Sequence, residues 1–285
     1  MQIALKKWGR SFLGEFTTGT APADGCFDGH SVWLTNGGDN TVVKRRASDG
    51  VIEGTFKTGL SPRGCLYDGQ YIWVANNGDG TVTKMAAVDG TVAGTFPVGR
   101  GPVKITFDDY AQFYVINQVD ETVSMLGWDG HLIRVVPVGH HPSDIVYTPA
   151  GVWVSNTGDD TLTQIVNGAP RTVSLGSNRA PTGMVFDGVN LWVTFAISNT
   201  VNAFDLTVGL AQAYGVGNAP VAVSFDGIYL WVVNSGDNTV TRIKPNDPNG
   251  VTKKTFAVGK NPSAIVFDSA NMWITNTGSN TASKR

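Results

Sequence analysis

The sequence predicts an all-β fold built from one repeated unit, and three observations support this prediction. A Gly-x-x-Pro motif, with Asn178 in place of Gly in the fifth copy, recurs at intervals of 39 to 42 residues. Each repeat contains four short runs with strand-like alternation, separated by Gly and Asp turns, without a helical stretch. An aromatic residue returns at one position of the second run. Four strands per repeat of about forty residues are typical of a propeller blade, so we expect a seven-bladed β-propeller with four antiparallel strands per blade. The motif prolines are Pro22, Pro62, Pro102, Pro142, Pro181, Pro220 and Pro262.

The second repeat shows the elements of a blade in order. Residues 65–67 and 71–75 alternate as strands around Asp68-Gly69, and a dipeptide of this kind between apolar runs is a strong hairpin signal. Residues 81–84 and 91–96 give the third and fourth strands. The same reading places the blade starts near residues 19, 59, 99, 139, 177, 217 and 259, within a single domain that covers residues 1–285.

The two ends of the sequence predict how the ring closes. Residues 280–285 match the third strand of a repeat, and residues 11–16 match the fourth strand of the second repeat. We therefore expect residues 11–16 to pair with the last strand and to complete blade seven, which removes open sheet edges.

Two recurring side chains have a structural interpretation. The aromatic position of the second strand is expected to pack between blades, because seven copies exceed what a ligand site needs. The Asn at the end of that strand is expected to bond its own turn, although a ring of Asn ligands is an alternative. The aromatic residues are Trp33, Trp73, Tyr114, Trp153, Trp192, Trp231 and Trp273, and the asparagines are Asn36, Asn76, Asn117, Asn156, Asn234 and Asn276.

The cysteines, the net charge and the apolar runs indicate which partners and locations are expected. Cys26 and Cys65 lie one register apart in equivalent repeats, which predicts opposite strand faces and two unpaired core thiols. A net charge of -2 and a pI near 6.1 provide no field for a polyanion, so no nucleic-acid partner is expected. No apolar run approaches twenty residues, so no membrane insertion is expected. Residues 1–10 lack the apolar segment of a signal peptide, and extracellular, surface-associated and virion locations all stay open.

Candidate site residues are those that break the repeat on the loops beside Gly-x-x-Pro. Six of them fall in blades two to four, where cationic and titratable groups are suited to a carboxylate, phosphate or sugar acid; a solvated rim is the alternative. In blade five, Phe195-Ala196-Ile197 replaces the polar turn and predicts an apolar partner contact at Phe195. No metal site or cofactor is predicted, since His140 and His141 are adjacent and diverge. The residues that break the repeat are Asp24, Arg179 and Lys260, together with the six of blades two to four. These six, which we call the predicted cluster, are Arg63, Arg100, Lys104, His140, His141 and Asp144.

The second strands resemble a known family. Trp73-Val74-Ala75-Asn76 and Trp231-Val232-Val233-Asn234 resemble the Tyr-Val-Thr-Asn (YVTN) repeat of bacterial and archaeal propellers, and the chain is more distantly similar to streptogramin B lyases and propeller lactonases. The resemblance implies the propeller fold and a superfamily with surface-layer and secreted binding members. Lyase-like propellers carry a Glu at the recurrent Asn and use His and Glu with a divalent metal; that Glu is absent here.

The expected function is a non-enzymatic binding or assembly module. Its variable top-face loops would meet a protein or glycan partner, in a cell-surface or virion assembly. A metal-dependent lyase-like or lactonase-like enzyme is the first alternative, and a purely structural scaffold is the second. The sequence leaves the oligomeric state undetermined.

Overall fold

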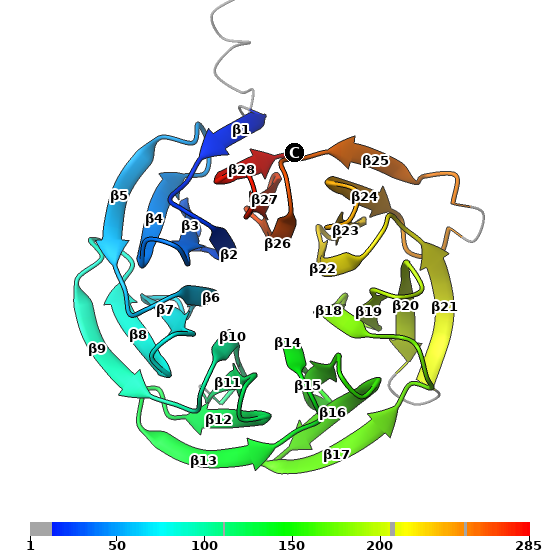
Figure 1. The fold of residues 1–285 in the computed structure, drawn as a ribbon, viewed down its shortest axis with the longest axis horizontal. Coiled ribbons are helices and arrows are strands. Elements are labelled where there is room, and N and C mark those ends of the chain that lie inside the picture. The colour runs from blue at the N-terminus through cyan, green and yellow to red at the C-terminus, as the bar shows by residue number, and fades with distance from the viewer. Residues whose placement is uncertain (1–12, 111, 206–208, 248–249) are drawn as a thin grey trace, which may run out of the picture.

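The strands form a ring of blades (Figure 1). The computed structural model describes residues 13–110, 112–205, 209–247 and 250–285, and within these it contains seven four-stranded antiparallel sheets. The first strand of each sheet lies nearest the central axis and the fourth lies at the periphery. The prediction of an all-β, seven-bladed β-propeller is therefore confirmed. None of the described residues belongs to a helix long and apolar enough to cross a membrane.

The strands of the first four blades follow one another along the chain. Blade one holds β2 (Pro22–Phe27), β3 (Ser31–Asn36), β4 (Thr41–Arg46) and β5 (Ile52–Lys57); blade two holds β6 (Pro62–Tyr67), β7 (Tyr71–Asn76), β8 (Thr81–Ala86) and β9 (Val92–Pro97). Blade three holds β10 (Pro102–Phe107), β11 (Phe113–Asn117), β12 (Thr122–Leu126) and β13 (Leu132–Pro137); blade four holds β14 (Pro142–Thr148), β15 (Gly151–Asn156), β16 (Thr161–Val166) and β17 (Ala169–Ser174).

The last three blades continue the series until the ring closes. Blade five holds β18 (Pro181–Phe186), β19 (Leu191–Phe195), β20 (Thr200–Asp205) and β21 (Gly209–Gly215); blade six holds β22 (Pro220–Phe225), β23 (Leu230–Asn234), β24 (Thr239–Ile243) and β25 (Lys254–Ala257). Blade seven holds β26 (Pro262–Phe267), β27 (Met272–Asn276), β28 (Thr281–Lys284) and, from the other end of the chain, β1 (Gly14–Thr17).

The N-terminal strand closes the ring as predicted. β1 pairs antiparallel with β28, with Gly14 opposite Lys284 and Thr17 opposite Thr281. The Phe16 ring packs on Trp273 at 5.0 Å between centroids, so the closure buries apolar surface as well as pairing backbone. Residues 11 and 12 of the predicted closing segment lie outside the described residues.

The aromatic position of the second strand is anchored by the turn before it. Trp33 is fully buried, and its Nε1 donates a hydrogen bond to Asp28 Oδ2 at 2.8 Å. The other oxygen of Asp28 accepts the backbone N–H groups of His30 and Ser31, so one carboxylate holds both the Asp-Gly turn and the indole. Trp33 packs in one apolar cluster with Cys65 and Ile72 of blade two, which confirms packing between blades as the role of this position. The same bond joins Trp73 to Asp68, Trp192 to Asp187, Trp231 to Asp226 and Trp273 to Asp268, and Tyr114 O–H donates to Asp108.

The recurrent Asn also has the structural role that the sequence predicts. In blade two, Asn76 Oδ1 accepts the N–H of Gly59 at 3.1 Å, and its Nδ2 donates to the hydroxyls of Thr81 and Thr83. The side chain therefore ties the Gly-x-x-Pro loop to the second and third strands. The asparagines are all fully buried, so their amides serve the blades themselves.

The prediction of two unpaired cysteines is wrong. Cys26 and Cys65 form a disulfide between blades one and two, with 5.4 Å between their Cα atoms. Their one-register offset does place them on opposite faces of their respective sheets. Adjacent blades in a ring, however, contact each other through opposite faces, so this offset brings the two side chains together.

Blade four lacks the hydrogen bond between a turn aspartate and the indole N–H of the second strand. This absence predicts a stabilising substitution. Thr148 stands where the other blades carry Asp, and the buried Trp153 Nε1 has no hydrogen-bond partner among the described residues. A hydrogen bond to a charged group contributes about 1.5–3 kcal/mol, part of which offsets burial of the new carboxylate. We expect Thr148→Asp to raise the free energy of unfolding by about 1 kcal/mol and Tm by about 2 °C, measured by denaturant and thermal unfolding. Asp226→Thr in blade six is the reciprocal control and should destabilise; a neutral effect of both would contradict this account.

Closure through β1 predicts a second effect on stability. Phe16→Ala removes the contact with Trp273 and with the Arg45 guanidinium, 5.7 Å above the same ring. Truncation of a largely buried Phe typically costs about 3 kcal/mol, and partial exposure reduces this to about 2 kcal/mol. Urea unfolding should show that loss, whereas Val88→Ala at an 83% exposed position should leave the midpoint unchanged. An unchanged midpoint for Phe16→Ala would exclude a contribution of the closing strand.

Candidate functional site

The site lies where the first strands approach the central axis. Two residues after each motif proline, the seven blades place equivalent side chains in one ring, and four of the seven are Gly or Ala. At Gly64 a Cβ atom would lie 2.8 Å from the carbonyl oxygen of Val103, so the close approach of β6 and β10 requires glycine. The three remaining positions are charged. The ring consists of Asp24, Gly64, Lys104, Asp144, Gly183, Ala222 and Ala264.

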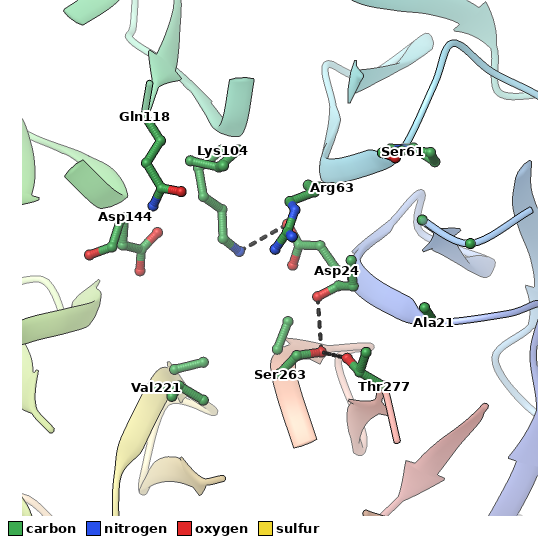
Figure 2. Close-up of a pocket in the computed structure, with 18 residues that line it drawn as sticks. Ala21, Asp24, Ser61, Arg63, Lys104, Gln118, Asp144, Val221, Ser263 and Thr277 are labelled. Atoms are coloured by element: carbon green, nitrogen blue, oxygen red, sulfur yellow. Dashed lines mark hydrogen bonds and ion pairs between the residues drawn. The ribbon is translucent and has the colours of Figure 1, made fainter. Parts of the chain in front are cut away.

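A cavity of about 410 Å³ opens at this ring (Figure 2). Its lining combines the three charged residues of the ring with Arg63 and with small polar side chains from the strands on either side. Such a mixture of apolar wall and few convergent polar groups is typical of ligand sites. Residues of the lining used below are Asp24, Arg63, Lys104, Gln118, Ser143 and Asp144.

Lys104 forms the central ion pair of the cavity. Its Nζ lies 2.9 Å from Asp24 Oδ2, which also accepts the backbone N–H of Cys65. Desolvation lowers the pKa of the Lys104 ammonium, but the attraction of Asp24 and Asp144 outweighs it and the pKa is raised overall. Lys104 therefore stays protonated and its charge is partly compensated by Asp24.

Asp144 faces the same cavity from blade four. Its Oδ2 accepts the N–H of Met184 at 2.7 Å, and its Oδ1 accepts the N–H of Ile145 at 2.9 Å. Burial raises the pKa of the Asp144 carboxyl, an effect that Lys104 and these backbone donors oppose and that Asp24 reinforces. The carboxylate is thus held in place by two blades while its ionisation is disfavoured.

Arg63 is the one cation of the lining without a partner among the described residues. Its backbone carbonyl accepts the hydroxyl of Thr35 at 2.6 Å, which fixes the main chain. Its guanidinium is exposed and makes no hydrogen bond or ion pair with any described residue. Figure 2 shows the side chain beside the Lys104–Asp24 pair. The five N–H donors of a guanidinium are therefore available to a ligand in the cavity.

The structure divides the predicted cluster in two. Arg63, Lys104 and Asp144 line the cavity, whereas Arg100, His140 and His141 do not. All three precede the motif proline in the sequence, whereas the three lining residues follow it on the first strand of their blade.

The three side chains outside the cavity, those of Arg100, His140 and His141, differ in their contacts on the rim. Arg100 Nε forms an ion pair with Asp120 at 2.6 Å. His140 Nδ1 lies 2.8 Å from Glu121 Oε1, and this hydrogen bond and charge raise the pKa of the imidazole. His141 is exposed and adopts the left-handed conformation, with φ of 51°. The rim is thus largely neutralised by local pairs.

The prediction that Phe195 offers an exposed contact is wrong. Its ring is fully buried in a cluster with Trp153, Met184 and Phe204, and the Arg179 guanidinium lies 5.5 Å from it. The reason is its register, because Phe195 occupies the recurrent Asn position, which points into the blade interior in every repeat. The exposed apolar side chain of this loop is Ile197, at 60% of its surface.

Asp24 is the functional residue that the predicted cluster omitted. It belongs to blade one, so grouping by neighbouring blades separated it from Lys104 in blade three. The signal that finds it is the shared position two residues after the proline. Among the described residues, no three His, Cys, Asp or Glu side chains come together as a set that could hold a metal ion.

Comparison with known proteins places the chain by fold alone. No family model and no curated protein sequence matches it. Its structure is similar to that of a streptogramin B lyase, with a TM-score of 0.82, 20% identity, and coverage of 97% of this chain and 98% of that one. It is also similar to a catalytically inactive virginiamycin B lyase from Staphylococcus aureus with quinupristin, with a TM-score of 0.83, 18% identity, and 96% and 98% coverage. The WD40 propeller domain of Doa1 gives 0.79, 12% identity, and 96% and 97% coverage. The structures to which this chain is similar thus include both a lyase and a WD40 β-propeller domain.

Proposed function

We propose that the protein is a non-enzymatic binding module whose channel-mouth cavity holds an acidic group of a protein or glycan partner. The observation that carries the proposal is the Arg63 guanidinium, which lines a cavity of about 410 Å³ and has no partner in the part of the chain that the structure describes. Arginine binds carboxylates through two parallel hydrogen bonds, which are stronger than those between neutral groups. The ion pair of Lys104 with Asp24 leaves Arg63 as the available cation.

The proposal includes the family and the setting of the protein. We assign the chain to the YVTN-repeat propellers on the strength of its own second strands. The Cys26–Cys65 disulfide supports an oxidising setting such as a cell surface or a virion, because disulfides persist there and are rare in the cytosol. In such an assembly the disc would present its channel mouth to the partner.

The alternatives have less support in the residues. A lyase-like enzyme of the kind that the resemblance implies would use His and Glu with a divalent metal, whereas both histidines of the predicted cluster lie outside the cavity and none of its lining residues is Glu. A purely structural scaffold leaves unexplained why three charged residues interrupt a ring of Gly and Ala around the axis.

Titration with a small sugar acid tests the role of Arg63. We expect calorimetry with D-glucuronate, N-acetylneuraminate and L-glutamate to give saturable binding of at least one probe. Loss of a charged hydrogen bond worth about 1.5–3 kcal/mol should weaken that binding at least about tenfold in Arg63→Ala, with a smaller loss in Arg63→Lys. The exposed Arg171 lies outside the cavity, so Arg171→Ala is the matched control. Equal binding by Arg63→Ala, or no binding of any probe, would overturn the proposal.

The raised pKa of Asp144 predicts the pH dependence of the same site. This carboxyl becomes neutral at a higher pH than an ordinary aspartate, and its protonation adds one positive charge to the balance of the cavity. Affinity for an ionised probe should therefore increase as the pH falls from neutral through that pKa. Asp144→Asn should bind more tightly at neutral pH and lose this part of the slope, in the same calorimetric titration. An identical pH profile in both proteins would show that Asp144 does not govern the cavity.

A further inference from the structure

A repeated contact joins neighbouring blades on the face opposite the channel mouth. In blade one, Lys44 Nζ lies 5.1 Å from the centroid of Trp33 and donates to the carbonyl of Ala87 in blade two. In blade two, Lys84 stacks on Trp73 and donates to the carbonyl of Trp128 in blade three at 2.9 Å. We call this contact the lysine latch. Blade seven has it too, because Lys284 stacks on Trp273 and donates to the carbonyl of Ala47.

The lysine latch is confined to blades one, two and seven, because other residues hold this position in blades three to six. Met125 lies opposite Tyr114 in the sheet, the position that Lys44 takes opposite Trp33. A thioether carries no N–H to donate to the turn at Asn167 in blade four. A groove of about 620 Å³ is present there, lined by Met125, Tyr114 and Asn167 among others, between the two green blades three and four of Figure 1.

Aromatic side chains form the walls of this groove. The turn between β10 and β11 is one residue longer than its counterparts and carries Tyr110, whose side chain is 82% exposed. From blade four, the Tyr147 hydroxyl donates to Asp109 Oδ2 at 2.9 Å, which bridges the two blades. Tyr114 donates to Asp108, so carboxylates orient two of the three phenol rings.

The rest of the groove lining combines apolar side chains with one guanidinium group. Ile133, Val152 and Ile165 supply the apolar part. Arg134 Nη1 donates to the carbonyl of Gly168 at 3.3 Å, which leaves further guanidinium N–H groups for a ligand. The groove therefore offers aromatic faces together with donors and acceptors at its edge.

We propose that this groove is a binding site for a neutral hexose unit, separate from the channel cavity and beyond the function proposed above. The apolar face of a sugar ring packs on tyrosine, while its hydroxyls both donate and accept hydrogen bonds. Asp108 lines the groove and Asp109 accepts the hydroxyl of the lining residue Tyr147. The charge balance of two carboxylates against the Arg134 guanidinium disfavours an anionic sugar or phosphate. A purely apolar ligand is also disfavoured, because it would bury the Arg134 donors without partners.

Ligand-observed NMR with the methyl glycosides of glucose, galactose, mannose and N-acetylglucosamine tests the site on the whole chain. We expect saturable binding of at least one glycoside. Tyr110→Ala should weaken it by about fivefold, the worth of one aromatic contact, and the exposure of Tyr110 makes this variant safe for folding. Met125→Lys should restore the latch, fill the groove and remove binding without lowering Tm.

Two controls separate this site from other effects. Gln70→Ala alters the equivalent turn position of blade two, and Arg63→Ala alters the channel cavity; both should leave glycoside binding unchanged. If no glycoside saturates, or if Tyr110→Ala and Met125→Lys both keep wild-type affinity, the assignment is wrong. Loss of binding in Arg63→Ala would place the sugar in the channel and likewise overturn it.

Discussion

The fold depends on burial of each blade by its two neighbours. A four-stranded sheet this small has two apolar faces, and Trp33, Trp73, Trp192 and Trp273 reach almost complete burial only between blades. The carboxylate that caps each Asp-Gly turn also satisfies the indole N–H, so one interaction sets the turn and the packing between blades together. Ring closure by β1, the lysine latches and the disulfide all act on the same contact between adjacent sheets.

Both proposed sites lie where this repetition is interrupted. At the channel mouth, charged residues replace Gly and Ala in a ring that otherwise only allows strands to approach. On the opposite face, a methionine replaces the latch lysine and leaves a groove with tyrosine walls. In each case the repeated scaffold supplies rigidity, and a few departures from the pattern in neighbouring blades supply the side chains of the site, as expected of sites held by supporting elements.

The sequence was sufficient for the fold because period, alternation and turn chemistry all indicate the same blade. It was also sufficient for the role of the asparagines, since their recurrence implies a local backbone need. It failed for Cys26 and Cys65, whose contact depends on how one blade faces the next rather than on the register within a blade. It also failed for Phe195, because the register of the recurrent Asn position, which points into the blade interior, was not applied to the residue that replaces Asn there. Arg63, Lys104 and Asp144 were found by their deviation from the repeat. Arg100 and the two histidines also deviate from the repeat, but they precede the motif proline. The three cavity residues follow it, on the first strand of the blade, and this difference in position was not used.

The charged ring at the axis has a geometric consequence for any partner. Seven blades of nearly equal shape give the disc a rotational pseudo-symmetry, and a partner guided by shape alone would dock in seven equivalent orientations. Asp24, Lys104 and Asp144 belong to blades one, three and four. No rotation of the disc by one or more blades reproduces this arrangement of charges. A partner with complementary charges therefore matches the ring in only one of the seven orientations. This match determines which blades contact each part of the partner.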